Sequence, residues 1–485
     1  MAFSSYVFLL AYLPITMIGY FFVNRFGNQA GKVFLIGASV IFYSYKAPDC
    51  FLVICGSMVL NWICYQFVKR RNGRFIKIIL TIGILANVLT LFVFKYYNFF
   101  AEQMNHAFHM DMIFTRLAVP LGISFFTFSQ ISFLIDGYRG EFAKAGLTNY
   151  VLYVLFFPKV VSGPIAGFAE MSEQFDDHER KRINWENVAW GLETFILGMG
   201  KKVLLADVLS RVVNYGFENV SCMNLPNSLI VMLCFTFEIY FDFSGYCDMA
   251  VGVAKILNIE LPVNFWSPYR AINIKEFWKR WHITLTRFLT KYIYIPLGGS
   301  RAGAVRKYLN IMIVFLISGI WHGANVTFVV WGALHGLARC FYEKFSRWID
   351  RIPRVIQWAG LFLFLNVTWF IFRADSITQL TDIVSGWKLK ELHPQFVNDG
   401  MLHTLLLPEL KFLADALLPK MSYNSICYLL FELLIVVCFL IVLKSKNNME
   451  RKHRQNAITA VMLALLLCWC TISFGSVNSF IYESF

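Results

Sequence analysis

Long apolar runs recur from one end of this 485-residue chain to the other, and they limit its fold more than any other feature. A helix needs roughly 20 apolar residues to cross the hydrocarbon core of a bilayer. Hydrophobic residues make up 58% of the chain and charged residues 15%, and the mean hydropathy is +0.56. A soluble protein of this length carries far more charge. Because the runs are continuous rather than alternating, they indicate helices and not β-barrel strands. The sequence therefore predicts an all-α, polytopic membrane helical bundle.

The apolar runs predict about 11–13 spans in a single membrane domain, residues 1–485. The runs at 33–45 and 150–161 are short, so we expect them to tilt or to form half-helices. The candidate spans are residues 3–23, 33–45, 51–68, 76–94, 150–161, 188–213, 229–257, 308–320, 327–345, 355–372, 423–443 and 457–474.

The net charge of +14 comes from 44 Lys and Arg against 30 Asp and Glu. Basic residues cluster in three short loops, at 69–77, 344–354 and 444–454. The positive-inside rule predicts that these loops are cytoplasmic, and counting spans then puts both termini outside. The segment 3–23 lacks a basic leading region, so we expect a retained first span in a multi-pass cell-membrane protein. These clusters favour anionic membrane lipids as partners over nucleic acid.

The sequence lacks the motifs of several common catalytic and metal-binding sites. The 11 cysteines are scattered, and no CxxC pair or HExxH occurs, so we expect no metal. No Walker loop, GxGxxG or GxSxG is present, which argues against nucleotide hydrolysis, a bound dinucleotide and a serine hydrolase. We expect no bound cofactor.

Two histidines lie among apolar and aromatic residues, where an ionisable side chain is costly. His282 stands in FWKRWHITL, and His322 stands in SGIWHGANVTFVVWGALHG. Imidazole is the side chain best suited to move protons near neutral pH. Catalysis or a hydrogen bond between helices would each explain His322, and an interfacial belt would equally explain His282. We expect His335, on the following helix, to be packed between helices.

Three further stretches carry polar residues at membrane depth. The stretch EIYFDFSGYCDMA holds Glu238, Asp242 and Asp248, which we expect to pair with Arg or His from other helices or to line a tunnel. The polar content of 117–140 favours a cavity-lining or re-entrant helix over a lipid-facing one. Alternating aromatic and basic residues at 262–299 favour helices at the interface or dipping into the protein core.

Six motifs between about residues 117 and 336 together resemble the membrane-bound O-acyltransferase (MBOAT) family. The resemblance is to the bacterial branch that includes the alginate O-acetylation acyltransferase and the teichoic-acid D-alanylation transferase. In chain order the motifs are PLGISFFTFSQISFLIDGYRG, FFPKVVSGPI, IYFDFSGYCDMA, SPYRAINIKEFWKRWH, YIYIPLGGSR and WHG.

The resemblance implies a funnel-like bundle with a central tunnel, in which His322 is the catalytic base and His282 the second characteristic histidine. It implies transfer of an acyl group, acetyl above all, from a cytoplasmic thioester such as acetyl-CoA to a hydroxyl of an exported polysaccharide or a partner protein. An extracytoplasmic SGNH-hydrolase-like acetyltransferase or the polysaccharide export machinery is the expected partner. Residues expected to contact substrate or donor are Trp278, Lys279, Arg280, Trp281, Asn273, Asp242, Ser244, Trp321 and Asn325.

The chain ends in SFIYESF, residues 479–485, which resembles the aromatic tail of this branch and would let Tyr482 help to relay the acyl group. The chain departs from the family pattern at Thr290 and Lys291, where Arg-Asp is usual, and this puts any contact made by that pair in doubt. Glu238 and Cys247 also replace the common Gln and Ser.

Three alternatives to acetylation remain open. One is D-alanyl transfer to teichoic acid from a carrier-protein thioester. A second is a transporter or flippase that moves an acyl or lipid-linked intermediate without chemistry, which polar residues at depth would also suit. A third is a scaffold subunit of an export complex.

Overall fold

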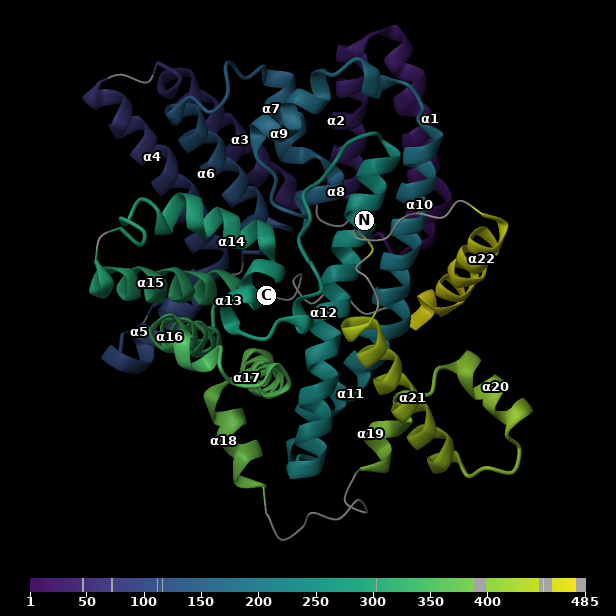
Figure 1. The fold of residues 1–485 in the computed structure, drawn as a ribbon. Coiled ribbons are helices and arrows are strands. Elements are labelled where there is room, and N and C mark those ends of the chain that lie inside the picture. Colours follow the sequence, from purple (N-terminus) through teal and green to yellow (C-terminus); the bar gives the residue numbers. More distant parts are fainter. Residues whose placement is uncertain are drawn as a thin grey trace. The chain divides into compact units, whose positions relative to one another are not determined.

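The chain is mostly helical in the part that the structure, a computed structural model, describes (Figure 1). The described residues are 1–45, 48–70, 73–110, 112–115, 117–301, 303–387, 398–444, 448 and 456–476, and they form no strand. Eight helices among them are long and apolar enough to cross a membrane: Phe8–Phe26, Pro48–Val68, Arg74–Asn105, Leu225–Ile256, Ala304–His322, Arg354–Arg373, Tyr423–Leu443 and Ala457–Gly475. The predicted all-α, multi-pass bundle is confirmed. The other expected spans correspond to shorter or more polar helices, such as α2 (Asn28–Ser44) and α16 (Val326–Ile349).

The helices group into two compact units that are interleaved along the chain. The first unit comprises Met1–Gly198, Tyr246–Val263 and the start of α22 (Ala457–Ile472). Its helices are α1 (Leu13–Val23), α2, α3 (Pro48–Val68), α4 (Arg74–Leu91), α5 (Tyr97–Phe108), α6 (Ile123–Arg139), α7 (Leu147–Leu155), α8 (Phe157–Val160), α9 (Phe168–Asp176) and most of α10 (Trp185–Gly200).

The second unit comprises Met199–Gly245, Asn264–Lys452 and the remainder of the chain from Ala464. The long helix α12 (Leu225–Ile256) contributes residues to both units. The other helices of this unit are α11 (Asp207–Glu218), α13 (Ile274–Arg280), α14 (Ile283–Leu289), α15 (Ala304–His322), α16, α17 (Arg354–Arg373), α18 (Ile377–Ser385), α19 (Asp399–His403), α20 (Pro408–Leu417) and α21 (Tyr423–Leu443).

The polar helix α6 lies inside the first unit, where it packs against α3 and α4. All but a few of its residues are buried. Its polar side chains bond to other helices: the Tyr150 hydroxyl donates to Gln130 Oε1, and Gln130 Nε2 donates to Ser57 Oγ. This helix therefore faces protein and not lipid, in agreement with that part of the prediction, and its role as a cavity-lining or re-entrant helix stays a prediction.

Glycines bring α15 and α16 close together in the second unit. A Cβ atom on Gly319 would lie 2.3 Å from the Phe328 carbonyl oxygen, and one on Gly332 would lie 2.5 Å from the Phe315 carbonyl oxygen. Both distances are far inside van der Waals contact, so only glycine fits at these positions. This crossing lies one turn before the end of α15 and thereby fixes the position of His322.

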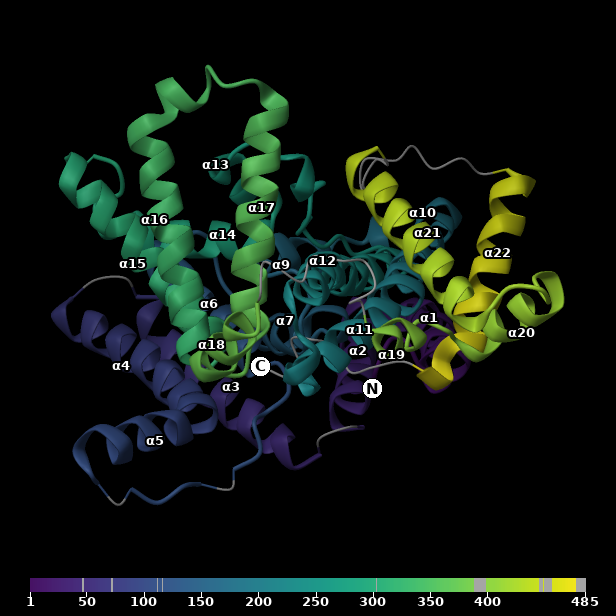
Figure 2. The ribbon, with the colours of Figure 1, turned by 90° about the horizontal axis from the view of Figure 1, so that it is seen from below.

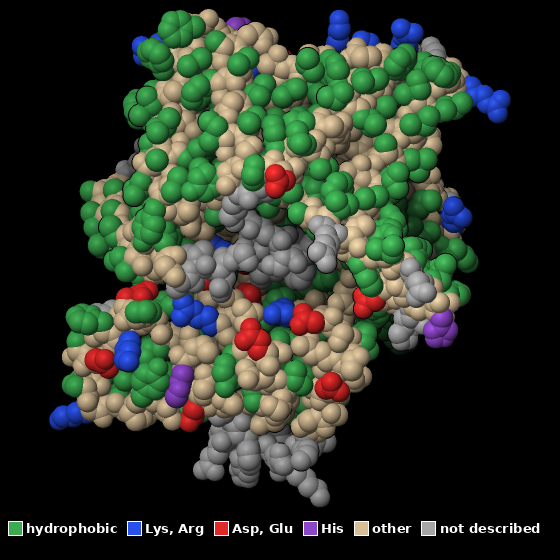
Figure 3. Space-filling model, turned by 180° about the vertical axis from the view of Figure 1, so that it is seen from behind, with side chains coloured by type: hydrophobic (Ala, Val, Ile, Leu, Met, Phe, Trp, Pro, Cys, Tyr) green, Lys and Arg blue, Asp and Glu red, His purple; other side chains and the backbone are tan. Residues whose placement is uncertain are grey.

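Apolar side chains cover much of the face shown in Figure 3. Large hydrophobic residues such as Leu52, Phe341 and Phe412 are highly exposed. Such broad exposure is unusual in a soluble protein and is expected where helices face lipid.

Candidate active site

His282 lies in the turn between α13 and α14, and a single asparagine holds its ring. Asn264 Oδ1 lies 3.1 Å from His282 Nδ1, 3.2 Å from the Thr284 backbone nitrogen and 2.9 Å from Thr284 Oγ1. A backbone N–H can only donate, so the atom that it meets is the amide oxygen of Asn264. His282 Nδ1 must then carry the hydrogen, which leaves the lone pair of a neutral ring on Nε2.

The free nitrogen of His282 is buried and makes no hydrogen bond to any residue that the structure describes. The side chain is only 1% exposed, and burial lowers the pKa of His282. The ring is therefore neutral at physiological pH and offers a lone pair to a substrate. His282 also has a left-handed backbone (φ 44°, ψ 52°), which is uncommon for a non-glycine residue and is over-represented at functional sites.

His322 is the last residue of α15 and sits among aromatic rings. Its side chain is 4% exposed, and its ring centroid lies 5.0 Å from Trp321, 5.1 Å from Trp331 and 5.3 Å from Phe372. The Trp321 ring also lies 6.0 Å from the His282 ring. The structure thus brings the two predicted histidines to one shared indole, in a water-poor environment that strengthens electrostatic interactions.

His335 is packed between helices, as expected. Trp278 Nε1 donates to His335 Nδ1 at 3.3 Å, so the hydrogen of the neutral ring is on Nε2, which lies 3.1 Å from Thr368 Oγ1. Both ring nitrogens are therefore occupied by the protein. His335 and Trp278 thus bond to each other, whereas His282 Nε2 has no hydrogen-bond partner among the described residues.

A buried ion network joins α12 to the start of α11 and to the π-helical turn before α11, Lys201–Ala206. Lys202 Nζ lies 2.7 Å from Asp207 Oδ1 and 2.6 Å from Asp242 Oδ1, and all three side chains are almost fully buried. Asp242 is therefore paired with a lysine, a cation that the sequence reasoning did not name. One helical turn before Asp242, Glu238 is buried as well.

Three other side chains that were predicted to contact substrate or donor, on α13 and at the starts of α13 and α16, bond to groups within the protein. Arg280 Nη2 pairs with Glu276 at 2.8 Å. Asn273 and Asn325 cap α13 and α16 by accepting the backbone N–H of Glu276 and Thr327. These contacts explain the residues as helix caps and an ion pair, and a role in donor binding stays a prediction.

The other predicted site residues differ in burial. Trp281 is buried and packs against Trp369 with ring centroids 4.9 Å apart, whereas Lys279 is exposed. Ser244 is buried two residues after Asp242 on α12. Tyr482 and the tail 479–485 lie outside the described residues. No group of three or more His, Cys, Asp or Glu side chains in the described ranges could hold a metal ion.

Two residues of this site were missed by the sequence reasoning. Asn264 lies 18 positions before His282, and no local spacing connects them. Lys202 offered a signal, because it is a cation within the apolar run 188–213. A buried cation in a membrane protein needs a carboxylate partner, and α12 supplies one.

We expect Asn264→Ala to lower the transfer rate about 10–100-fold, because losing the acceptor frees the His282 ring to rotate or change tautomer. The rate should be measured at saturating and at limiting donor. Asn264→Asp keeps the acceptor oxygen and should recover part of the rate. Equal loss of folded protein and of activity in both variants would show that Asn264 acts on stability alone.

Residues 58–378, about two thirds of the chain, match the model of the MBOAT, membrane-bound O-acyltransferase family. The chain belongs to the membrane-bound O-acyltransferase family. The match includes His282, His322, Asn264 and the ion network of Lys202.

Curated relatives of this MBOAT protein span most of its length. The chain is 32% identical to the peptidoglycan O-acetyltransferase of Helicobacter pylori, over 100% of the chain and 97% of the relative. It is 33% identical to the probable alginate O-acetylase AlgI of Pseudomonas aeruginosa, over 84% of the chain and 80% of the relative. Identity to the teichoic acid D-alanyltransferase of Bacillus subtilis is 27%, over 55% of the chain and 68% of the relative. This MBOAT protein is a multi-pass membrane acyltransferase.

Proposed function

We propose that the chain transfers an acetyl group from acetyl-CoA on the cytoplasmic side to a hydroxyl of an exported cell-envelope polysaccharide. The observation that carries this proposal is the end-to-end similarity to a protein named as a peptidoglycan O-acetyltransferase. The similarity to alginate O-acetylases supports the same acyl group and a polysaccharide acceptor.

In the proposed reaction, His322 acts as the base. The imidazole takes the proton from the acceptor hydroxyl as that oxygen attacks the thioester carbonyl. The new C–O bond forms, the C–S bond breaks, and the departing thiolate recovers the proton from the imidazolium. The products are the acetyl ester and the free thiol, so protons and electrons balance without a metal or an oxidant.

His282 binds the donor in this proposal. Its free Nε2 accepts a hydrogen bond from an amide N–H of the pantetheine arm of coenzyme A. Asn264 keeps the ring in the tautomer that allows this bond. The aromatic side chains around both histidines exclude water, which would otherwise hydrolyse the thioester.

The expected partner is an extracytoplasmic SGNH-hydrolase-like acetyltransferase, which would present the exported polymer to this site. The positive-inside rule, applied to the basic loops at 69–77, 344–354 and 444–454, supports a cytoplasmic donor side and extracytoplasmic termini. A role of Tyr482 in relaying the acyl group would require this topology.

D-alanyl transfer from a carrier-protein thioester is the second candidate, favoured by the similarity to teichoic acid D-alanyltransferases over half of the chain. The purified protein in nanodiscs should be given radiolabelled acetyl-CoA or D-alanyl carrier protein, with a glycan acceptor. We expect labelled glycan and free thiol only with acetyl-CoA. Label from the D-alanyl carrier alone would reverse the assignment, and no transfer from either donor would contradict acyltransferase activity.

A further inference from the structure

A long apolar pocket opens between α16 and α17 in the second unit. The two helices pack against each other and are joined by a loop, and α13 packs against α16 (Figure 2). The cavity volume is about 870 Å³, within the range of about 300–1,000 Å³ that is typical of sites for small organic ligands. We propose that this pocket binds the acyl chains of an anionic phospholipid, with the lipid phosphate at the basic loop that joins α16 to α17.

The walls of the pocket fit hydrocarbon. α17 is one of the helices long and apolar enough to span the membrane, so lipid surrounds this wall. Several of the lining side chains are large, apolar and exposed, which is expected of a surface in contact with lipid chains. Lining residues that show this are Leu337, Phe341, Phe345, Ile352 and Ile356.

One end of the pocket, which we call the inner end, adjoins the packed core of the unit. Leu334 and Phe364 line this inner end, and the Phe364 ring lies 5.1 Å from the ring of His335. Because both nitrogens of His335 are already bonded, the inner end offers no free polar group at that ring. An acyl chain terminus suits this end better than a charged or hydroxylated group.

The outer end of the pocket is basic. Lys344 lines the cavity, and the following turn and loop carry Arg347, Arg351 and Arg354. Between residues 339 and 354 there are five cations and two carboxylates, a net charge of +3. Basic pockets between helices on the cytoplasmic side are suited to anionic lipid headgroups.

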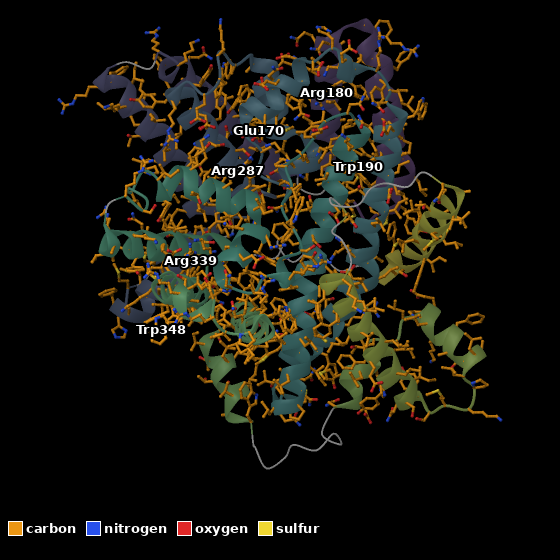
Figure 4. The ribbon with its side chains drawn as sticks, in the orientation of Figure 1. Glu170, Arg180, Trp190, Arg287, Arg339 and Trp348 are labelled. Atoms are coloured by element: carbon orange, nitrogen blue, oxygen red, sulfur yellow. The ribbon has the colours of Figure 1, made fainter. Side chains whose placement is uncertain are left out.

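The carboxylate of Glu343, which lies next to Lys344 in the chain, does not neutralise the positive charge at this end of the pocket. Glu343 is bound by three cations: Arg339, Lys307 and Lys275. Figure 4 labels Arg339 on α16, and it also labels Trp348 near the end of that helix. Trp348 is 76% exposed, as expected of an aromatic residue at the membrane–water interface. The basic end of the pocket therefore lies at headgroup level.

A buried acceptor near this end also lacks a partner. Gln357 lines the pocket with 8% of its surface exposed, and its Nε2 donates to the Ile352 carbonyl oxygen at 2.7 Å. Its Oε1 has no hydrogen bond to any of the described residues. A hydroxyl of a glycerol headgroup would satisfy this oxygen, which makes phosphatidylglycerol the best-matched anionic phospholipid.

The test uses the full-length protein in nanodiscs of phosphatidylcholine with an increasing share of phosphatidylglycerol. Retained lipid should be counted by native mass spectrometry after transfer to detergent. Gly360 lines the pocket, and a Cβ atom added there meets no heavy atom within 4 Å, so Gly360→Leu fills the cavity without a clash. Gly56→Leu on α3 is the matched control, since Gly56 is equally open and lies in the other unit.

We expect the wild type and Gly56→Leu to retain one phosphatidylglycerol, and Gly360→Leu to retain none. Lys344→Gln should weaken the preference for the anionic headgroup about fivefold. Equal retention in all variants, or equal retention of phosphatidylcholine and phosphatidylglycerol, would overturn the proposal. Displacement of the lipid by acetyl-CoA at micromolar concentration would also overturn it, because the pocket would then belong to the acyl donor.

Discussion

Replacing His322 by alanine should lower the acyl-transfer rate by about 10²–10⁴-fold, the usual contribution of a positioned general base. The ring is almost completely buried among Trp321, Trp331 and Phe372, so no water or neighbouring side chain replaces it at the same position. Initial rates of thiol release and of acceptor labelling should fall together.

The exposed His178 provides the control for this variant. His178→Ala should keep the wild-type rate, and both variants should elute as the wild type does on size exclusion. A transporter of acyl intermediates would keep moving its cargo without His322 and would show no thiol release in the wild type. Wild-type transfer by folded His322→Ala would remove His322 from the mechanism.

Replacing Lys202 by methionine should cost about 3–5 kcal/mol of folding stability, the largest stability effect that we expect of any single change. The substitution keeps the length and apolar stem of the side chain but leaves Asp207 and Asp242 buried without their cation. Thermal unfolding in detergent, followed by tryptophan fluorescence, measures the loss as a lower transition temperature.

A second variant separates charge from packing in this network. Removing all three charges together, as Lys202→Met with Asp207→Asn and Asp242→Asn, should recover much of the stability, because no uncompensated charge stays buried. A triple variant as unstable as Lys202→Met alone would show that the lysine acts by packing and not by compensating the two carboxylates.

The sequence alone was sufficient to predict those structural features that depend on local composition. Apolar runs predicted the membrane helices, and the polar content of 117–140 predicted that α6 faces protein. These features follow from whether each side chain prefers water, lipid or the protein interior. A single sequence contains that information.

Contacts between distant segments could not be predicted in this way. Asn264 holds His282 across 18 positions that include helix α13, and Lys202 reaches Asp242 across 40 positions. Neither pair has a fixed spacing, because the loop and the helix crossing decide which side chains meet. The basic and aromatic residues around His282 suggested a donor site from composition, yet Trp278 and Arg280 have partners within the protein.

The central claim is that a buried imidazole acts as the base in the transfer of an acyl group from a thioester on one side of the membrane to a hydroxyl on the other. It is tested most directly in sealed, uniformly oriented proteoliposomes. Radiolabelled acetyl-CoA is supplied only on the side of the basic loops, and a glycan acceptor only on the opposite side. We predict label on the glycan across the membrane with the wild type and none with His322→Ala. Label that appears only on an acceptor placed with the donor, or equal labelling by both proteins, would contradict the account.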